Sequence, residues 1–380
     1  MATGLRRAVA VAATTLMVVT GCARGGTPEP VMAPALAERL DAAVTGAMDA
    51  GAIPGALVGV WSPEGEYLKA FGVADKASGT PMETGFYHRI GSVTKTFTGT
   101  AVLQLAGEGK LGLDDPIAAY IEGVPGGATI TVRDLAGMRS GLVDYTKTAG
   151  FEAAVAADPR ADFTPQQLLG WAFAEAPVSP PGREVDYCNT NYVLLGLLVE
   201  KVSGKSFGDY LSAAILGPLG MSDTSFPTGT QFPEPHARGY TEPLEDTGPP
   251  VDASGWSASF TWAAGAMVST LDDMRTWLPA LANGTLVKPE LQEQRMRTYP
   301  EAGAPADFGY GLGIFTVAGW IGHNGSVPGY QTVALYLPER ETTLLVMINT
   351  DVGVPGVGDP SGILTSAITA VLTPDRVYRL

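Results

Sequence analysis

The stretch Ser92-Val93-Thr94-Lys95 decides the interpretation of this chain, because it places a serine hydroxyl three residues before a lysine amine. Side chains three apart share one face of a helix, so a helical stretch would bring the two groups together. Apolar residues cover most sides of the segment that follows: Val93, Phe97, Ala101, Val102, Leu103 and Leu105. Such a helix is normally buried, and an unpaired buried ammonium is costly. We therefore expect Lys95 to have a function that explains its burial.

Two further motifs follow in order, Tyr187-Cys188-Asn189 and His323-Asn324-Gly325, and each occurs once. Taken alone, Ser-x-x-Lys is a weak pattern. Tyr187 alone would be interpreted as a packed aromatic residue, and His323 alone as a structural histidine in a strand. The three motifs together favour one catalytic site instead.

The motifs resemble those of the serine penicillin-recognising hydrolases, the group of class C β-lactamases, D-alanyl-D-alanine carboxypeptidases, D-amino-acid peptidases and related esterases. Further segments extend the resemblance over about residues 36–372: Phe86, residues 89–91, 140–142, 217–221, 264–270 and 309–313. The resemblance implies an α/β (α+β) fold, with an antiparallel sheet flanked by helices and an inserted all-helical domain. The active site would lie between the two domains.

The periodicity of the chain agrees with this organisation. Strands are expected at residues 57–61, 67–73, 321–325, 332–337 and 343–348, and helices at residues 36–47 and 363–372. Strands at both ends of the chain predict a sheet that the chain leaves and rejoins. We expect one sheet domain formed by residues 36–95 and 300–380, and a mainly helical domain at residues 96–299.

The N-terminal residues 1–22 are expected to be a lipoprotein signal peptide. Arg6 and Arg7 precede an apolar run at residues 8–19 that is too short to span a bilayer. Residues 19–22 resemble a lipobox, so Cys22 would carry the lipid, and residues 23–35 would form a flexible tether. The chain would then be exported and anchored to the outer face of the membrane. An ordinary cleaved signal and a secreted protein are the alternative.

Composition limits the partners. A chain with 45% hydrophobic residues can bury a large core, and 39 acidic against 24 basic residues give a net charge of −15. This charge repels phosphate backbones, so nucleic acid is not an expected partner. Three scattered histidines show no metal-ligand spacing, and the glycines at 309, 311 and 313 do not match a dinucleotide-binding motif. We expect neither metal nor cofactor, and a monomer.

The chemistry expected of the site is nucleophilic attack by Ser92 through an acyl-enzyme. A base must take the serine proton, and the two candidates, Lys95 and Tyr187, have ordinary pKa values of about 10.4 and 10. Lowering either pKa to about 7 requires roughly 4 kcal/mol. The two groups would titrate as a coupled pair, so which one holds the proton stays open.

The resemblance adds roles for the site residues. It implies that Tyr187 takes the proton from Ser92 and delivers it to the leaving group, while Lys95 tunes both. It also implies that Asn189 bonds Lys95 and the substrate amide. Residues 324–326 would lie along the substrate, because Gly325 keeps side-chain bulk away from the strand edge. The backbone N–H groups of Ser92 and Ser326 would form the oxyanion hole. His323 stands where β-lactamases of this group have lysine.

Other chemistries fit less well. Residues 204–208 match the Gly-x-Ser-x-Gly pattern, but a strand should precede that serine, and residues 192–199 have helical periodicity. Ser206 with Asp209 is instead typical of a helix N-cap. Cys188 is interpreted as a packed residue that faces away from Tyr187. His88 and His236 are interpreted as structural.

The function predicted is a serine hydrolase, foremost a D-alanyl-D-alanine carboxypeptidase or D-peptidase that acts on peptidoglycan stem peptides. Residues 298–339 contain no lysine or arginine to bind a substrate carboxylate, so an esterase or β-lactamase on the same machinery is a rival. A non-catalytic, lipid-anchored envelope-binding protein is a second class of function. The intact Ser92, Lys95 and Tyr187 argue against it.

Overall fold

The computed structural model describes Met1, residues 30–244 and residues 248–380. The lipidation site predicted at Cys22 lies outside the described residues. Among the described helices, none is both long and apolar enough to cross a membrane.

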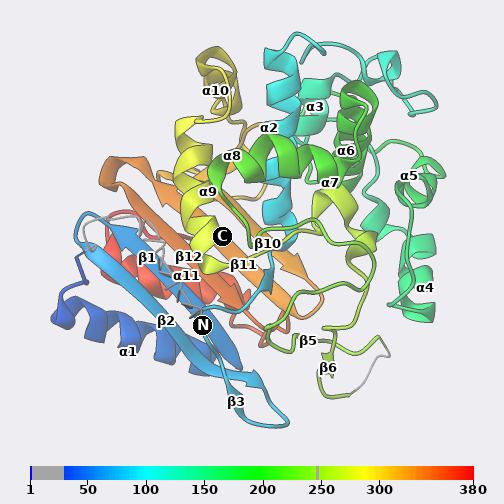
Figure 1. Cartoon of the computed structure of the whole chain (residues 1–380). Coiled ribbons are helices and arrows are strands. Elements are labelled where there is room, and N and C mark those ends of the chain that lie inside the picture. The colour runs from blue at the N-terminus through cyan, green and yellow to red at the C-terminus, as the bar shows by residue number, and fades with distance from the viewer. Residues whose placement is uncertain (2–29, 245–247) are drawn as a thin grey trace.

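The structure is built on an antiparallel sheet that joins the two ends of the chain (Figure 1). Its strands follow the order β3-β2-β1-β12-β11-β10-β9-β8. The long strands are β1 (Gly55–Ser62), β2 (Gly65–Asp75), β10 (Trp320–Val327), β11 (Tyr330–Leu337) and β12 (Thr342–Ile348). The short ones are β3 (Thr80–Pro81), β8 (Gly309–Tyr310) and β9 (Phe315–Val317). Because β1 pairs with β12, the chain leaves the sheet and rejoins it, which confirms the predicted fold class.

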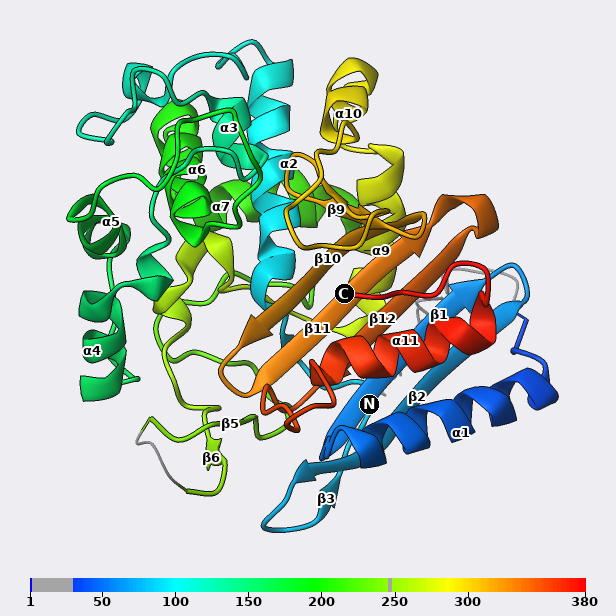
Figure 2. The same cartoon turned by 180° about the vertical axis from the view of Figure 1, so that it is seen from behind.

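Helices cover both faces of the sheet. Helices α1 (Pro34–Ala50) and α11 (Pro360–Leu372) pack together on one face (Figure 2), and α9 (Leu271–Asn283) packs on the other. Strands between two helical layers are buried on both sides, which explains why β11 is apolar along most of its length. Helix α9 lies within the segment that was expected to form the helical domain. It packs on the sheet because its buried residues recur at helical spacing: Leu271, Met274, Trp277, Leu278 and Leu281.

The remaining helices form a second region beside the sheet (Figure 1). They are α2 (Thr94–Gly107), α3 (Val132–Ala136), α4 (Ala149–Ala157), α5 (Pro165–Phe173), α6 (Asn189–Ser203), α7 (Phe207–Leu211), α8 (Gly217–Leu219) and α10 (Pro289–Arg295). Helices α2 and α6 pack against each other, so the first turns of both are held in the interior.

The residues around Ser206 form the predicted helix start. Helix α6 ends before Gly204, and the Ser206 hydroxyl accepts a hydrogen bond from the Asp209 amide. The nucleophile elbow of a Ser-His-Asp hydrolase needs a strand before the serine, and here a helix precedes it. The N-cap interpretation is confirmed.

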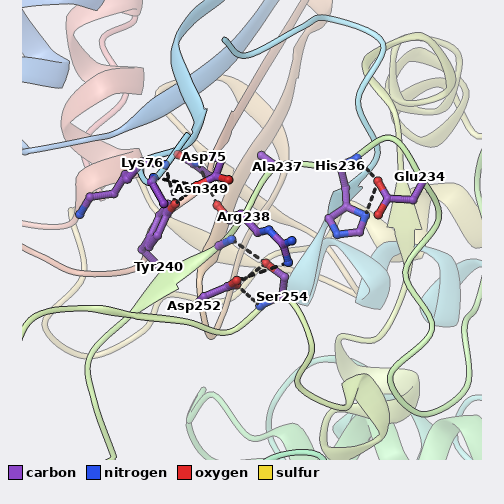
Figure 3. A network of polar contacts seen from close by, with 12 residues as sticks. Asp75, Lys76, Glu234, His236, Ala237, Arg238, Tyr240, Asp252, Ser254 and Asn349 are labelled. Carbon is purple, nitrogen blue, oxygen red and sulfur yellow. Dashed lines mark hydrogen bonds and ion pairs between the residues drawn. The ribbon is translucent and has the colours of Figure 1, made fainter. Parts of the chain in front are cut away.

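A polar network fixes the loop segments 234–240 and 252–254 to the sheet (Figure 3). The Asn349 side chain donates to the carbonyl of Arg238 at 3.0 Å, and Arg238 pairs with Asp252 at 3.4 Å. The carbonyl of Ser254 in this loop accepts a hydrogen bond from the buried Arg89 guanidinium at 3.1 Å. Arg89 precedes Ser92 by three residues, so the network fixes the backbone segment that leads to the predicted nucleophile.

Two histidines lie in structural surroundings. The His88 imidazole is buried against the carbonyl of Gln331 at 3.1 Å, and burial lowers its pKa to about 3. His236 stacks on Phe232 with ring centroids 4.0 Å apart. Its Nδ1 lies 2.8 Å from the carbonyl oxygen of Pro233. Both agree with their structural interpretation.

Candidate active site

Ser92 lies at the junction of the sheet and the helical region. It belongs to a short 3-10 turn, Gly91–Val93, that leads directly into α2. Gly91 has φ +52°, and a Cβ there would meet the Ser326 nitrogen at 2.9 Å, so the turn requires glycine. Ser92 faces a cavity of about 560 Å³, which is within the usual size of a small-molecule site.

Lys95 is fully buried and its amine reaches three oxygen atoms. The Nζ atom lies 2.9 Å from Ser92 Oγ, 2.8 Å from Asn189 Oδ1 and 2.8 Å from the carbonyl oxygen of Ala264. An ammonium has three N–H groups, so these partners satisfy it completely. Burial nevertheless lowers the pKa of Lys95 to about 7, because the charged form is desolvated.

The partners of Lys95 fix where its lone pair points after it loses a proton. A neutral amine keeps two N–H groups and gains one acceptor site. The Ala264 carbonyl and the Asn189 Oδ1 atom can only accept, so they keep the two N–H groups. The lone pair then faces the Ser92 hydroxyl. The geometry makes the neutral form of Lys95 a base aimed at Ser92.

The orientation of the Asn189 amide is set by a carboxylate that the sequence did not reveal. Asp144 is 5% exposed, and its Oδ2 accepts from Asn189 Nδ2 at 3.0 Å. Its Oδ1 accepts from the backbone nitrogen of Thr146 at 3.1 Å and from the Thr146 hydroxyl at 2.9 Å. Because a carboxylate cannot donate, Asn189 must present its oxygen to Lys95. The charge of Asp144 also opposes the fall in the pKa of Lys95.

Asp144→Asn is expected to move the pH dependence of activity. Activity rises with pH as Lys95 loses its proton, and this rising part of the kcat/KM profile is called the limb here. Without the negative charge of Asp144, the pKa of Lys95 falls further, so the limb moves to lower pH. The rate at the plateau should also fall, because Asn189 loses its fixed orientation. Steady-state kcat/KM across pH measures both effects.

Asp273→Asn is the matched control. This carboxylate is also buried, but it lies in the first turn of α9 and accepts hydrogen bonds from the Asp223 amide and the Thr224 hydroxyl. It should leave the limb in place. A lower plateau without any displacement of the limb in Asp144→Asn would show that Asp144 only supports the local structure.

Tyr187 shares the serine with Lys95. Its phenol is hydrogen-bonded with Ser92, and its ring lies 4.9 Å from the Lys95 amine. Burial raises the pKa of Tyr187 well above its usual value, although the bond with Ser92 opposes this rise. Tyr187 therefore keeps its proton in the free site. A nearby cation would favour the phenolate of Tyr187, but burial outweighs this effect and favours the neutral form of both groups.

His323 is placed in the wall of the same cavity but is fully enclosed. Its Nδ1 lies 2.5 Å from the carbonyl oxygen of Asn324, so Nδ1 carries the proton. Its Nε2 then accepts from the Tyr310 hydroxyl at 3.0 Å. Burial lowers the pKa of His323 to about 3, so the imidazole is neutral. The structure thus uses His323 to hold Tyr310, whose ring packs edge-on against Tyr187 at 6.1 Å.

The free edge of β10 runs beside the serine turn. Strand β9 pairs only with residues 320–322 of β10, so residues 323–327 are unpaired on that side. A Cβ on Gly325 would meet the Ile90 carbonyl at 2.1 Å and the Ser92 nitrogen at 2.8 Å. The Ser92 and Ser326 amides are thereby brought to one place. Asn324 and Ser326 line the cavity with Ser92, as expected for substrate-contacting residues.

Gly325→Ala is expected to reduce kcat/KM by about 100-fold or more, because the new methyl group displaces the Ser92 amide from the oxyanion position. Ester hydrolysis measures the loss, and circular dichroism verifies the fold. Gly170→Ala in α5 is the control, since a Cβ there meets no atom within 4 Å. Unchanged hydrolysis by Gly325→Ala would place the substrate away from β10.

Cys188 is buried beside Tyr187, and its thiol points to the Leu142 carbonyl at 3.4 Å. Burial raises the pKa of the thiol to about 12, so it is not a nucleophile. In the described part of the chain, no cluster of three or more histidine, cysteine, aspartate or glutamate side chains is arranged to hold a metal ion.

Comparison with known proteins gives a consistent result. The family model described as Beta-lactamase matches residues 40–365. The D-aminopeptidase of Cereibacter sphaeroides is 30% identical over 312 aligned positions, and the match covers 78% of this chain and 57% of that protein. The chain thus spans under two thirds of the length of that curated relative.

Solved structures match over a larger share of their length. The D-stereospecific amidohydrolase from Streptomyces sp. is 29% identical with a TM-score of 0.77, covering 90% of this chain and 98% of that one. The D-amino acid amidase from Ochrobactrum anthropi SV3, complexed with L-phenylalanine amide, is 28% identical with a TM-score of 0.77. That match covers 89% of this chain and 100% of the amidase.

Proposed function

The chain belongs to the β-lactamase family, and from that premise we propose that it is a serine hydrolase that forms an acyl-enzyme on Ser92. The observation that carries the proposal is the geometry of Lys95. Its amine lies 2.9 Å from Ser92 Oγ, its pKa is lowered to about 7, and its other two partners can only accept.

Acylation begins with neutral Lys95. It takes the Ser92 proton while Oγ bonds to the substrate carbonyl carbon, and the carbonyl electron pair moves to oxygen. The amides of Ser92 and Ser326 stabilise this oxyanion. When the bond to the leaving nitrogen breaks, Tyr187 donates a proton to it, and the proton on Lys95 restores the phenol. Tyr187 suits this step because it keeps its proton in the free site.

Deacylation uses the same groups in reverse. Water gives a proton to neutral Lys95 as its oxygen attacks the acyl carbon. The Ser92 oxygen leaves and regains the proton, so the net reaction consumes one water molecule. Neither step requires a metal ion or a cofactor.

The acyl donor that we favour is an amide or a short peptide of a D-amino acid. Among the described residues that line the cavity, none is lysine or arginine, and His323 is neutral. A carboxypeptidase must hold the terminal carboxylate of its substrate, and the cavity wall offers no cation for this. The names of the similar proteins, a D-aminopeptidase and a D-amino acid amidase, support the same choice.

Export and lipid anchoring at Cys22 are proposed from the N-terminal pattern alone. Cys22→Ala should release the protein from the membrane fraction, whereas an unchanged distribution would exclude the lipid anchor. The complete set of Ser92, Lys95 and Tyr187 argues against the non-catalytic envelope-binding alternative.

Intact-mass spectrometry tests the proposed function. The protein is exposed in parallel to a D-phenylalanine amide, an acetyl-D-Ala-D-Ala peptide, p-nitrophenyl acetate and penicillin. We expect turnover of the amide and an acyl adduct with at least one of the activated donors. Absence of both turnover and adduct with every donor would exclude a serine hydrolase.

A further inference from the structure

Glu301 is a half-buried carboxylate in the wall of the cavity that contains Ser92. Its backbone forms a parallel bridge with Val185, and its carboxylate accepts a hydrogen bond from the Tyr187 amide. One residue, Tyr187, therefore bonds Glu301 through its backbone and Ser92 through its phenol.

The charge of Glu301 is not balanced by a close cation. Among the described residues, no lysine, arginine or histidine nitrogen lies within 4.0 Å of its carboxylate. Burial raises the pKa of Glu301 and the charge of Asp186 raises it further, while exposed Lys147 only partly opposes these effects. A half-buried carboxylate without a close cation is less favourable than one that a cation approaches.

The other carboxylate side chain that lines the cavity is already occupied. The carboxylate of Asp359 accepts from Gln331 Nε2 at 2.6 Å, from the Ser361 hydroxyl at 2.7 Å and from the Gly362 amide at 2.9 Å. Lys95 does not line the cavity, and all three N–H groups of its protonated form are bonded. Of the two side-chain carboxylates that line this cavity, Glu301 is thus the one that has the capacity to receive a ligand cation.

The rest of the wall suits an organic cation. The aromatic rings of Phe308, Tyr310 and Phe315 line the same cavity. Aromatic faces attract ammonium groups, and a low-dielectric surrounding strengthens a charge-assisted hydrogen bond to a carboxylate.

We propose that Glu301 binds a free ammonium group of the acyl donor, so that the enzyme selects substrates with an unblocked amine. This inference rests on the proposed function, because it concerns the substrate of the same site. Glu301 acts as a specificity-determining residue: it contacts the substrate but takes no part in the proton transfers at Ser92.

The test compares free and blocked amines. Kinetics are measured with a D-phenylalanine p-nitroanilide and its N-acetyl derivative, and with a glycyl-D-phenylalanine p-nitroanilide and its N-acetyl derivative. The second pair places the amine one residue further from the scissile carbonyl. The wild type should prefer the free amine in at least one pair. In Glu301→Gln, KM for that free amine should rise by about tenfold or more, while KM for its acetylated partner stays within about twofold.

Asp359→Asn is the matched control, because it removes a carboxylate from the same cavity and leaves an asparagine that can still cap α11. It should keep the preference. The acylation rate with p-nitrophenyl acetate reports on the serine machinery separately, since this donor has no amine, and it should be equal in Glu301→Gln and the wild type. A wild type that acylates normally but shows no preference for a free amine would overturn the inference. Equal losses for the free and the acetylated substrates in Glu301→Gln would also overturn it, and neither result would affect the proposed function.

Discussion

Ser92→Ala is expected to abolish the acyl-enzyme. No adduct should form with penicillin or p-nitrophenyl acetate, and kcat/KM should fall by about 10⁴-fold or more, because the atom that bonds the acyl group is absent. The fold should survive, since Ser92 contributes one of three hydrogen bonds to Lys95 and its loss costs about 1 kcal/mol. Intact-mass spectrometry and a thermal unfolding curve measure the two effects.

Ser206→Ala is the matched control for this variant. Ser206 lies in the other serine motif of the chain, where it caps α7. Removing the cap should cost about 1 kcal/mol of stability and leave the adduct unchanged. An adduct that persists in Ser92→Ala, or that disappears in Ser206→Ala, would assign the nucleophile to a different serine.

The architecture was predictable from the sequence because its signals are local. The strands that became β1, β2, β10, β11 and β12 are apolar runs of strand length, and those at opposite ends of the chain were expected in one sheet. The position of α9 was not predictable in the same way. An amphipathic pattern indicates that one face of a helix is buried, but it does not indicate whether a sheet or another helix covers that face.

The site residues divide by the same principle. Ser92 and Lys95 are neighbours in sequence, so their contact follows from helical spacing. Asp144 contacts Asn189, which lies 45 residues further along the sequence. The local sequence around Asp144 indicates only a turn residue that bonds the Thr146 amide. Glu301 lies in a segment that gives no periodic pattern, so its place beside Tyr187 depends on the tertiary fold.

The protonation states of the site residues were the hardest property to predict from the sequence, because they depend on burial. The sequence left open whether Lys95 or Tyr187 takes the serine proton. Burial lowers the pKa of Lys95 to about 7 and raises the pKa of Tyr187 well above its usual value. Both shifts favour the neutral forms, which separates a base that is ready near neutral pH from an acid that keeps its proton.

Lys95→Met is expected to have the second-largest effect. Methionine has a similar length and fills the buried space, but it carries no base, so the acylation rate should fall by about 10²- to 10⁴-fold. The rise of kcat/KM with pH near 7 should vanish, because the group that titrates there is gone. Stopped-flow acylation with p-nitrophenyl acetate across pH measures both the rate and the limb. Binding should change less than the rate, since Lys95 is enclosed and does not line the cavity.

Tyr187→Phe distinguishes the two candidate bases. If Lys95 is the base and Tyr187 the acid, the phenylalanine variant keeps the limb near pH 7, acylates an activated ester at a rate close to that of the wild type, and loses activity mainly on amides. An ester needs little help from an acid because its phenolate leaving group departs without a proton, whereas the nitrogen of an amide must be protonated before it leaves. Equal losses on ester and amide in Tyr187→Phe, together with a Lys95→Met variant that keeps its limb, would assign the base to Tyr187. The ratio of ester to amide rates in these two variants therefore identifies the group that takes the serine proton.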